Sequence, residues 1–289
     1  MKEYGDELVN VDLTNYNTYG IKTMAKYVIK PFPDKLVNLL EYLEQEDIKW
    51  YILGSGSNVI LPDKSFDGAI IKMDYFNVIK FKKNEVEVES GMLLSKFAKK
   101  LLDQGFTNFA FAISIPGTVG SAILGNVGCF GENIFDYVKD ITLLDENRDV
   151  VTLTKDDIEY SYRYTEFKER NVIILKATLW IEKGNIDEAK EEIKKNLIIR
   201  KNTQPLEYKN AGSVFRNPKD DSAGRLIDVA GLKGLTIGGA KISEKHANFI
   251  INFKDAKSSD IIKLIEITKE KVKEKNKIEL ELEQIIVNW

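Results

Sequence analysis

Short runs of alternating or continuous apolar residues dominate the first 180 residues of the chain, and helical spacing interrupts them twice. The apolar runs predict strands, which we expect at residues 25–30, 50–53, 68–72, 78–82, 85–89 and 171–182, and in a hairpin over 138–153 that turns at 145–148. One helix is predicted after the N-cap candidate Asp34, from Leu36, Leu39, Leu40 and Leu43, and another over 92–103, from Leu94, Phe97, Ala98 and Leu101. Residues 1–20 show neither pattern and are expected to be irregular. Strands that alternate with single helices favour an α+β fold.

The pattern changes after Gly184, where we place a boundary between residues 1–184 and 185–289. A charged helix is predicted over 187–202, with an apolar stripe of Ile193, Leu197 and Ile198. A stretch rich in glycine and asparagine follows over 203–250. A helix capped at Ser258 or Ser259 should run to about 275, with Ile261, Ile262, Leu264, Ile265 and Val272 buried. The alternation over 278–287 predicts a final strand.

Composition excludes several classes of protein. Lys and Arg total 42 and Asp and Glu total 45, so the net charge of −3 argues against general nucleic-acid binding. One cysteine and one histidine exclude a disulfide framework and any metal centre built from several His or Cys ligands, so we expect no metal. No run of about 18 apolar residues is present, and the polar start resembles no signal peptide. We therefore expect a cytoplasmic protein without a membrane partner.

Two glycine-rich segments are the first candidates for ligand binding. Gly54, Ser55, Gly56, Ser57 and Asn58 follow a predicted strand, where consecutive N–H groups could hold phosphate oxygens. This is not a Rossmann fingerprint, because the third glycine would fall at Val59, and no Walker lysine follows. The segment 113–131 is apolar but irregular, and a dinucleotide would satisfy its buried backbone groups. Ordinary glycine turns remain the alternative for both segments.

Other candidate side chains are weaker when each is taken alone. Arg163 lies among tyrosines at 160–164, and a desolvated arginine can face an anion. Ser213 is flanked by small residues that leave its hydroxyl accessible. His246 could complete a catalytic triad only as the single histidine, and a structural role is the more common one. Glu281 and Glu283 share one face of the predicted last strand. A surface arginine and a solvated strand face remain the alternatives for the tyrosine segment and for the two glutamates.

Taken in order, these segments resemble the UDP-N-acetylenolpyruvoylglucosamine reductase (MurB) family. The resemblance runs from Asn17 to Glu283, and its strongest segments are GSGSN (54–58), IPGTVGSA (115–122), YSYR (160–163), AGSVFRNP (211–218), AGRLID (223–228) and LELE (280–283). It implies an FAD-binding domain of the vanillyl-alcohol-oxidase (PCMH) type over 1–184 and a substrate-binding domain over 185–289. It also implies that the last strand returns to the first lobe. The absence of an extra segment matches the shorter type II form.

The resemblance implies an NADPH-dependent flavoenzyme that reduces UDP-GlcNAc-enolpyruvate to UDP-N-acetylmuramate for peptidoglycan synthesis. Arg163 would stabilise the charge that develops beside the substrate carboxylate, Ser213 would donate a proton to carbon, and Glu283 would be the C-terminal catalytic glutamate. The implied FAD contacts are Gly54, Ser55, Gly56, Ser57, Asn58, Pro116, Gly117, Thr118, Gly120, Ser121, Asn126 and Gly128. The implied substrate contacts are Tyr162, Lys209, Arg216, Asn217, His246 and Asn248. Arg163, Ser213 and Glu283 should converge beside the flavin.

The chain departs from the family pattern at a few positions, and none of them removes a catalytic side chain. Lys22-Thr23 and Lys209-Asn210 replace the usual Gly-Gly and Pro-Ser, residues 126–133 are less rich in Ala and Gly, and the ending at 284–288 lacks the usual Val-Arg. Two alternatives stay open. One is an FAD-dependent alcohol oxidase of the same superfamily, and the other is a non-catalytic regulator that binds flavin or a nucleotide sugar. We expect a monomer that acts on small molecules.

Overall fold

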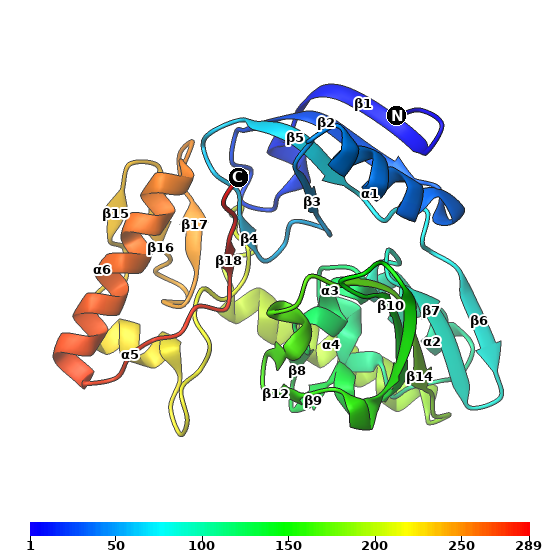
Figure 1. Cartoon of the computed structure of the whole chain (residues 1–289). Coiled ribbons are helices and arrows are strands. Elements are labelled where there is room, and N and C mark those ends of the chain that lie inside the picture. The colour runs from blue at the N-terminus through cyan, green and yellow to red at the C-terminus, as the bar shows by residue number, and fades with distance from the viewer. The chain divides into compact units, whose positions relative to one another are not determined.

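The computed structural model describes all 289 residues, and the chain forms two compact units (Figure 1). Unit 1 comprises Met1–Glu7, Ile29–Gly54 and Ile70–Leu197, and unit 2 comprises Leu8–Val28, Ser55–Ala69 and Ile198–Trp289. Both units are discontinuous in the sequence, whereas the expected domains are continuous, so the boundary near residue 184 stays a prediction. The mixture of helices and mainly antiparallel strands confirms the α+β class.

An antiparallel five-stranded sheet lies at the centre of unit 1, with the strand order β11-β10-β14-β7-β6 (Figure 1). Its strands are β6 (Ile79–Lys82), β7 (Glu85–Glu89), β10 (Val138–Leu144), β11 (Val150–Thr154) and β14 (Ile173–Trp180). Helices α2 (Leu94–Asp103) and α3 (Val119–Leu124) bury their apolar residues in the same core as β7, β10 and β14. The predicted strands of this sheet and the helix α2 are therefore confirmed.

A second sheet has the strand order β1-β2-β5-β3, and the chain passes from one unit to the other within β1, β2 and β5. Its strands are β1 (Gly5–Asp12), β2 (Met24–Pro31), β3 (Trp50–Ile52) and β5 (Phe66–Ile71). The expectation that residues 1–20 are irregular is wrong, because residues 5–12 form β1 and pair with β2. The sequence does not indicate this strand, since most of its residues are exposed and show no apolar alternation. Helix α1 (Leu36–Gln45) follows a 3₁₀ turn, and its N-cap is Lys35 rather than Asp34.

Shorter elements complete unit 1. Strand β8 (Gly128–Cys129) pairs with β9 (Glu132–Asn133), and β12 (Tyr160–Ser161) pairs with β13 (Tyr164–Thr165). The segment 113–131, expected to be irregular, contains α3, because Thr118 and Ser121 form a capping box at its start. The 3₁₀ turns of the chain are η1 (Thr14–Tyr16), η2 (Pro33–Lys35), η3 (Ala110–Ser114), η4 (Ile134–Asp136), η5 (Lys155–Asp157) and η6 (Glu166–Lys168).

In unit 2 a small antiparallel sheet, β15-β16-β17, packs against the long helix α6 (Figure 1). Its elements are α5 (Ala223–Val229), β15 (Thr236–Ile237), β16 (Ala240–Ile242), β17 (Ile250–Asn252) and α6 (Ser258–Asn276). Neither Ser258 nor Ser259 is the N-cap of α6, which is Lys257. Instead the backbone N–H groups of these serines donate to the carboxylate of Asp63, at 2.6 and 3.2 Å.

The C-terminal segment forms less strand than expected. Only β18 (Ile285–Ile286) is a strand, and it runs parallel to β4 (Val59–Ile60) of the same unit, so the expected return to the first lobe stays a prediction. Before it, Leu282 makes one isolated bridge to Phe215.

Helix α4 (Ile186–Thr203) also differs from its prediction. Leu197 and Ile198, which were expected on its apolar stripe, are 46% and 51% exposed. Ala189 is the one buried residue of this charged helix, so the predicted stripe does not pack against a core. None of the helices is both long enough and apolar enough to cross a membrane.

Candidate active site

Unit 1 contains a pocket of 160 Å³ among the ends of β3, β5 and β7, the start of β14 and the first turns of α3. Four of the expected cofactor residues line it, namely Gly54, Thr118, Gly120 and Ser121. Residues from both glycine-rich segments therefore share one cavity, although about 60 residues separate them in the sequence.

Close packing explains why glycine stands at position 120, whereas a Cβ atom at position 54 would meet only ordinary van der Waals contacts. A Cβ atom on Gly120 would lie 2.8 Å from the Cβ of Ser90, and the N–H of Gly120 donates to the Ser90 carbonyl at 2.8 Å. A Cβ atom on Gly54 would lie 3.5 Å from the hydroxyl of Thr118. The N–H of Thr118 donates to the hydroxyl of Ser121 at 3.0 Å, and the N–H of Ser121 donates to the hydroxyl of Thr118 at 3.3 Å. This capping box starts α3 at the edge of the pocket.

Two polar side chains in the pocket were missed by the sequence reasoning. Ser90 is only 3% exposed, and its hydroxyl oxygen has no hydrogen-bond partner in the protein. The ammonium group of Lys72 donates to the carbonyl of Gly54, and burial lowers the pKa of this lysine. An unpartnered buried hydroxyl and a half-buried cation between glycine walls suit a ligand that carries phosphate groups and ring acceptors, as FAD does.

The rest of the first glycine segment belongs to unit 2 and has structural contacts of its own. Gly56 has φ +65°, and a Cβ atom there would lie 2.1 Å from the Tyr16 carbonyl, so only glycine fits. The hydroxyl oxygen of Ser55 is buried without a partner. The side-chain amide of Asn58 donates to the Glu283 carbonyl at 3.0 Å. Asn58 therefore fixes the backbone of the predicted catalytic glutamate.

Arg163 occupies the turn of the β12–β13 hairpin in unit 1, with φ +58°. Its guanidinium donates to the carbonyls of Asn126, at 3.4 Å, and Gly128. The Asn126 side chain is buried, donates to the Ser161 carbonyl at 2.8 Å and accepts from the N–H of Phe135 at 3.3 Å. The Asn126 side chain thus holds the Arg163 hairpin, and its expected contact with the cofactor stays a prediction.

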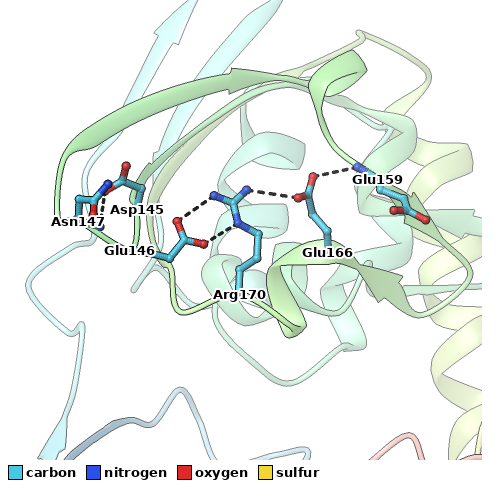
Figure 2. Close-up of polar contacts among 6 residues, drawn as sticks. All are labelled: Asp145, Glu146, Asn147, Glu159, Glu166 and Arg170. Atoms are coloured by element: carbon cyan, nitrogen blue, oxygen red, sulfur yellow. Dashed lines mark hydrogen bonds and ion pairs between the residues drawn. The ribbon is translucent and has the colours of Figure 1, made fainter.

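An ion-pair network closes the base of the same hairpin (Figure 2). The N–H of Glu166 donates to the carbonyl of Glu159 at 3.0 Å, and the N–H of Glu159 donates to the carboxylate of Glu166 at 3.1 Å. Arg170 donates to Glu166 at 3.2 Å and to both carboxylate oxygens of Glu146 at 2.8 and 3.0 Å. The hydrogen bond from Arg170 lowers the pKa of Glu146 to about 2. The network ties the hairpin to the turn between β10 and β11.

Tyr162, the other residue in the hairpin turn, is exposed. Its ring lies 5.3 Å from the guanidinium carbon of Arg163. The expected FAD contacts Pro116, Gly117 and Gly128 lie just before α3 and in β8, and the Gly117 carbonyl accepts from Leu94 at 3.0 Å. Direct contacts from these residues stay predictions.

In unit 2 the structure brings Ser213 and Glu283 onto adjacent extended segments. The N–H of Glu283 donates to the carbonyl of Val214 at 2.9 Å, and the N–H of Val214 donates to the carbonyl of Asn248 at 2.9 Å. The Ser213 hydroxyl is half-buried and has no hydrogen-bond partner in the chain. Arg163 belongs to unit 1, so its convergence with these two residues stays a prediction.

Two of the expected substrate residues, Asn248 and His246, support the Ser213 segment, and their contacts with a substrate stay predictions. Asn248 is buried, and its amide accepts from the N–H of Phe215 at 2.9 Å and donates to the carbonyl of the same residue at 2.8 Å. His246 accepts from the N–H of Asn248 at 3.2 Å and packs against the ring of Phe249. Burial, followed by the charge of Lys233, lowers the pKa of His246, so the ring is neutral.

The other expected substrate residues lie at the ends of this segment. Arg216 pairs with Glu281 at 3.5 Å, while its buried Nε has no partner. The side-chain oxygen of Asn217 accepts from the N–H of Ala223 at 3.1 Å, at the start of α5. The side chain of Lys209 lies over Gly20. The buried Nε of Arg216 thus has no acceptor within the protein, and its contact with a substrate stays a prediction.

Comparisons with known proteins agree with this arrangement. The C-terminal domain model of UDP-N-acetylenolpyruvoylglucosamine reductase matches residues 204–287, and an FAD binding domain model matches residues 26–154. A reductase of that name from Caldanaerobacter subterraneus subsp. tengcongensis is 41% identical over 96% of this chain and 92% of its own length. A second, from Caldicellulosiruptor saccharolyticus, is 39% identical over 97% of this chain and 94% of its own length.

A solved structure supports the same assignment. The crystal structure of UDP-N-acetylenolpyruvylglucosamine reductase (MurB) from Thermus caldophilus aligns with a TM-score of 0.82 at 26% sequence identity, and covers 98% of this chain and 99% of that one. Sequence and fold therefore agree over nearly the full length, and the chain belongs to the UDP-N-acetylenolpyruvoylglucosamine reductase (MurB) family.

Proposed function

We propose that this chain reduces UDP-N-acetyl-3-O-(1-carboxyvinyl)-glucosamine to UDP-N-acetylmuramate, with FAD as cofactor and NADPH as reductant, in peptidoglycan precursor synthesis. The observation that carries the proposal is the likeness to reductases of this name, at 41% and 39% identity over nearly the whole chain. The alcohol oxidase and the non-catalytic regulator have no comparable support.

The reaction adds a hydride and a proton across the double bond of the enol ether. Bound FAD supplies the hydride-transfer chemistry that links NADPH to this bond. The unit 1 pocket supports binding of the cofactor there, with Lys72 and Ser90 as polar contacts and Gly54 and Gly120 as walls. These four residues would hold and orient the cofactor without taking part in proton transfer.

Arg163 is the group suited to the charge that develops beside the substrate carboxylate. Its guanidinium is already held by two backbone carbonyls, so little reorganisation is needed during the reaction. Glu283, when it carries a proton, would donate a hydrogen bond to the same developing charge. Both groups would act by stabilising charge and not by forming a covalent bond.

Ser213 would deliver the proton from its Oγ to the carbanion carbon and regain a proton from water. A serine hydroxyl is a weak acid, so it acts only against a strongly basic carbon held close by. The Ser213 hydroxyl has no competing partner in the chain, which leaves its proton available. Glu283 lies on the adjacent segment and would face the same reacting group.

Two half-reactions test the proposal. The purified protein should be yellow, NADPH should bleach its flavin spectrum without oxygen, and the enol ether should restore the spectrum. In Ser213→Ala, bleaching by NADPH should persist while restoration by the substrate collapses. Ser65→Ala, at an exposed position of the same unit, should behave like the natural chain. A protein that binds no FAD, or Ser213→Ala with normal turnover, would contradict the proposal.

The proposal includes a cytoplasmic location and a monomeric state. The monomeric state is supported by the predicted catalytic residues, which all come from this one chain. The cytoplasmic location is supported by the proposed substrates, which are both small molecules. Light scattering of the purified protein should give a mass near 32.9 kDa. A mass twice as large that persists on dilution would contradict the monomer.

A further inference from the structure

In the core of unit 2, the side chains of Tyr19 and Gln284 contact each other next to the segment that carries Ser213. Tyr19 is fully buried and Gln284 is 3% exposed, and the Tyr19 hydroxyl lies 3.0 Å from Oε1 of Gln284. The two residues are 265 positions apart in the chain. A buried polar pair is tolerated when each of its polar atoms has a partner, and such a satisfied pair rigidifies the groups that it joins.

The direction of each hydrogen bond follows from the neighbours of Gln284. Its Nε2 lies 3.1 Å from the carbonyl of Ala211 and 3.2 Å from the carbonyl of Gly212, and carbonyl oxygens only accept. The amide NH₂ must therefore face these carbonyls, which leaves Oε1 toward Tyr19. Tyr19 is then the donor, and every polar atom of the pair has a partner. Burial raises the pKa of Tyr19, so its hydroxyl keeps its proton at working pH.

Gln284 thereby connects the segment that carries Glu283 with the segment that carries Ser213. It directly follows Glu283 in the chain, and its amide binds the two residues that directly precede Ser213. Gly212 has φ +77°, nothing lies within 4 Å of a Cβ built on it, and its N–H donates to Oδ1 of Asn210 at 3.0 Å, so hydrogen bonds rather than side-chain packing fix this residue. The Gln284 amide is the side-chain group that holds the carbonyls of Ala211 and Gly212. Tyr19 fixes the amide itself, because without its hydroxyl the Oε1 atom is left buried and unpaired.

We propose that Tyr19 and Gln284 are positioning residues that hold the Ser213 hydroxyl and the Glu283 backbone in register for proton delivery to the substrate carbon. Neither side chain touches the reacting atoms. The inference rests on the proposed function, and it assigns a role in the reaction to two residues outside the expected catalytic set.

The test separates the two half-reactions in Tyr19→Phe and Gln284→Leu. Misplacement of a catalytic group by a fraction of an ångström to 1 Å costs up to about a hundredfold in rate. We expect restoration of the flavin spectrum by the enol ether to slow about tenfold in Tyr19→Phe and about a hundredfold in Gln284→Leu. Bleaching by NADPH and FAD content should stay unchanged in Tyr19→Phe. The solvent deuterium isotope effect on restoration should rise, since proton transfer then limits the rate more strongly.

Thr268→Val is the matched control. Thr268 is buried in the same unit, and its hydroxyl donates to the Leu264 carbonyl within α6, away from Ser213. This variant also loses one buried hydroxyl, so it should lose stability comparable to that lost by Tyr19→Phe but keep both half-reactions. Tyr19→Phe keeps the whole ring, so it tests the proposal even if Gln284→Leu fails to fold.

Two results would overturn the inference. One is an unchanged restoration rate and isotope effect in Tyr19→Phe. The other is a parallel loss of both half-reactions and of FAD in that variant, which would mean a purely structural role. Failure of the proposed function is distinguishable, because the natural chain itself would then show no restoration by the enol ether.

Discussion

Ser90 carries a buried hydroxyl without a partner, which is unfavourable in the protein unless a ligand uses it. Replacing Ser90 with alanine removes the unpaired group, so the cofactor-free protein should be as stable as the natural one or slightly more stable. The dissociation constant of FAD should rise by about 3- to 10-fold, the equivalent of one ordinary hydrogen bond. Quenching of flavin fluorescence measures this constant.

Thr142→Val is the control for Ser90→Ala, because its buried hydroxyl in β10 already has a partner, Thr152, at 3.0 Å. That variant should lose stability and keep its affinity for FAD. An unchanged dissociation constant in Ser90→Ala, or a rise of the same size in Thr142→Val, would exclude Ser90 as a cofactor contact.

At the scale of elements, charged groups link the base of the β12–β13 hairpin to the turn between β10 and β11. Arg170→Ala removes the link from Glu166 to Glu146 (Figure 2), so the turn that carries Arg163 should move more freely. We expect the restoration of the flavin spectrum by substrate to slow about three- to tenfold. The denaturation midpoint should change little, because exposed ion pairs contribute little to stability. An unchanged restoration rate would show that the hairpin does not need this network.

The same network has a defined pH dependence. The pKa of Glu146 falls from its ordinary 4.5 to about 2 in the folded protein, because Arg170 binds the ionised form. A carboxyl whose pKa is lowered by folding stabilises the protein above its ordinary pKa and loses that contribution as pH falls toward the folded value. The urea midpoints of the natural chain and of Glu146→Gln should therefore show a small difference, as expected of an exposed ion pair, which is greatest at pH 6 and disappears between about pH 4.5 and 2. A difference that stays constant across this range would contradict the ion pair.

The elements that could be predicted from the sequence are those that bury one clear face. Helix α2 appears where predicted because Leu94, Phe97 and Leu101 recur at helical spacing and are all buried. Strand β1 could not be predicted, since its residues are mostly exposed and it is held by hydrogen bonds to β2. The last strand was overestimated because alternation persists over 278–287, although only Ile285 and Ile286 have a strand partner, β4.

At the scale of the whole molecule, long-range contacts explain which site residues could be predicted. The resemblance supplied Ser213 and Glu283, and the structure places both on adjacent segments. Lys72 follows an apolar run like many surface lysines, so nothing in the sequence marks it as part of a pocket. The structural contacts of Asn126 and Asn248 could not be predicted, because the sequence shows an amide without showing the carbonyls that it binds 33 to 35 residues away.

Because the pocket lies wholly within unit 1, cofactor binding should protect the two units unequally. A ligand that binds only the folded state stabilises it by about 2.7 kcal/mol at a concentration of 100 times its dissociation constant. FAD should therefore raise the melting temperature and slow amide exchange most at the pocket walls, in β7, α3 and the start of β14. Helix α6 and the β15–β17 sheet contribute no residue to the pocket and serve as the internal control. Exchange that slows most in these unit 2 elements would place the cofactor elsewhere, because protection by a ligand is greatest where its binding suppresses local opening.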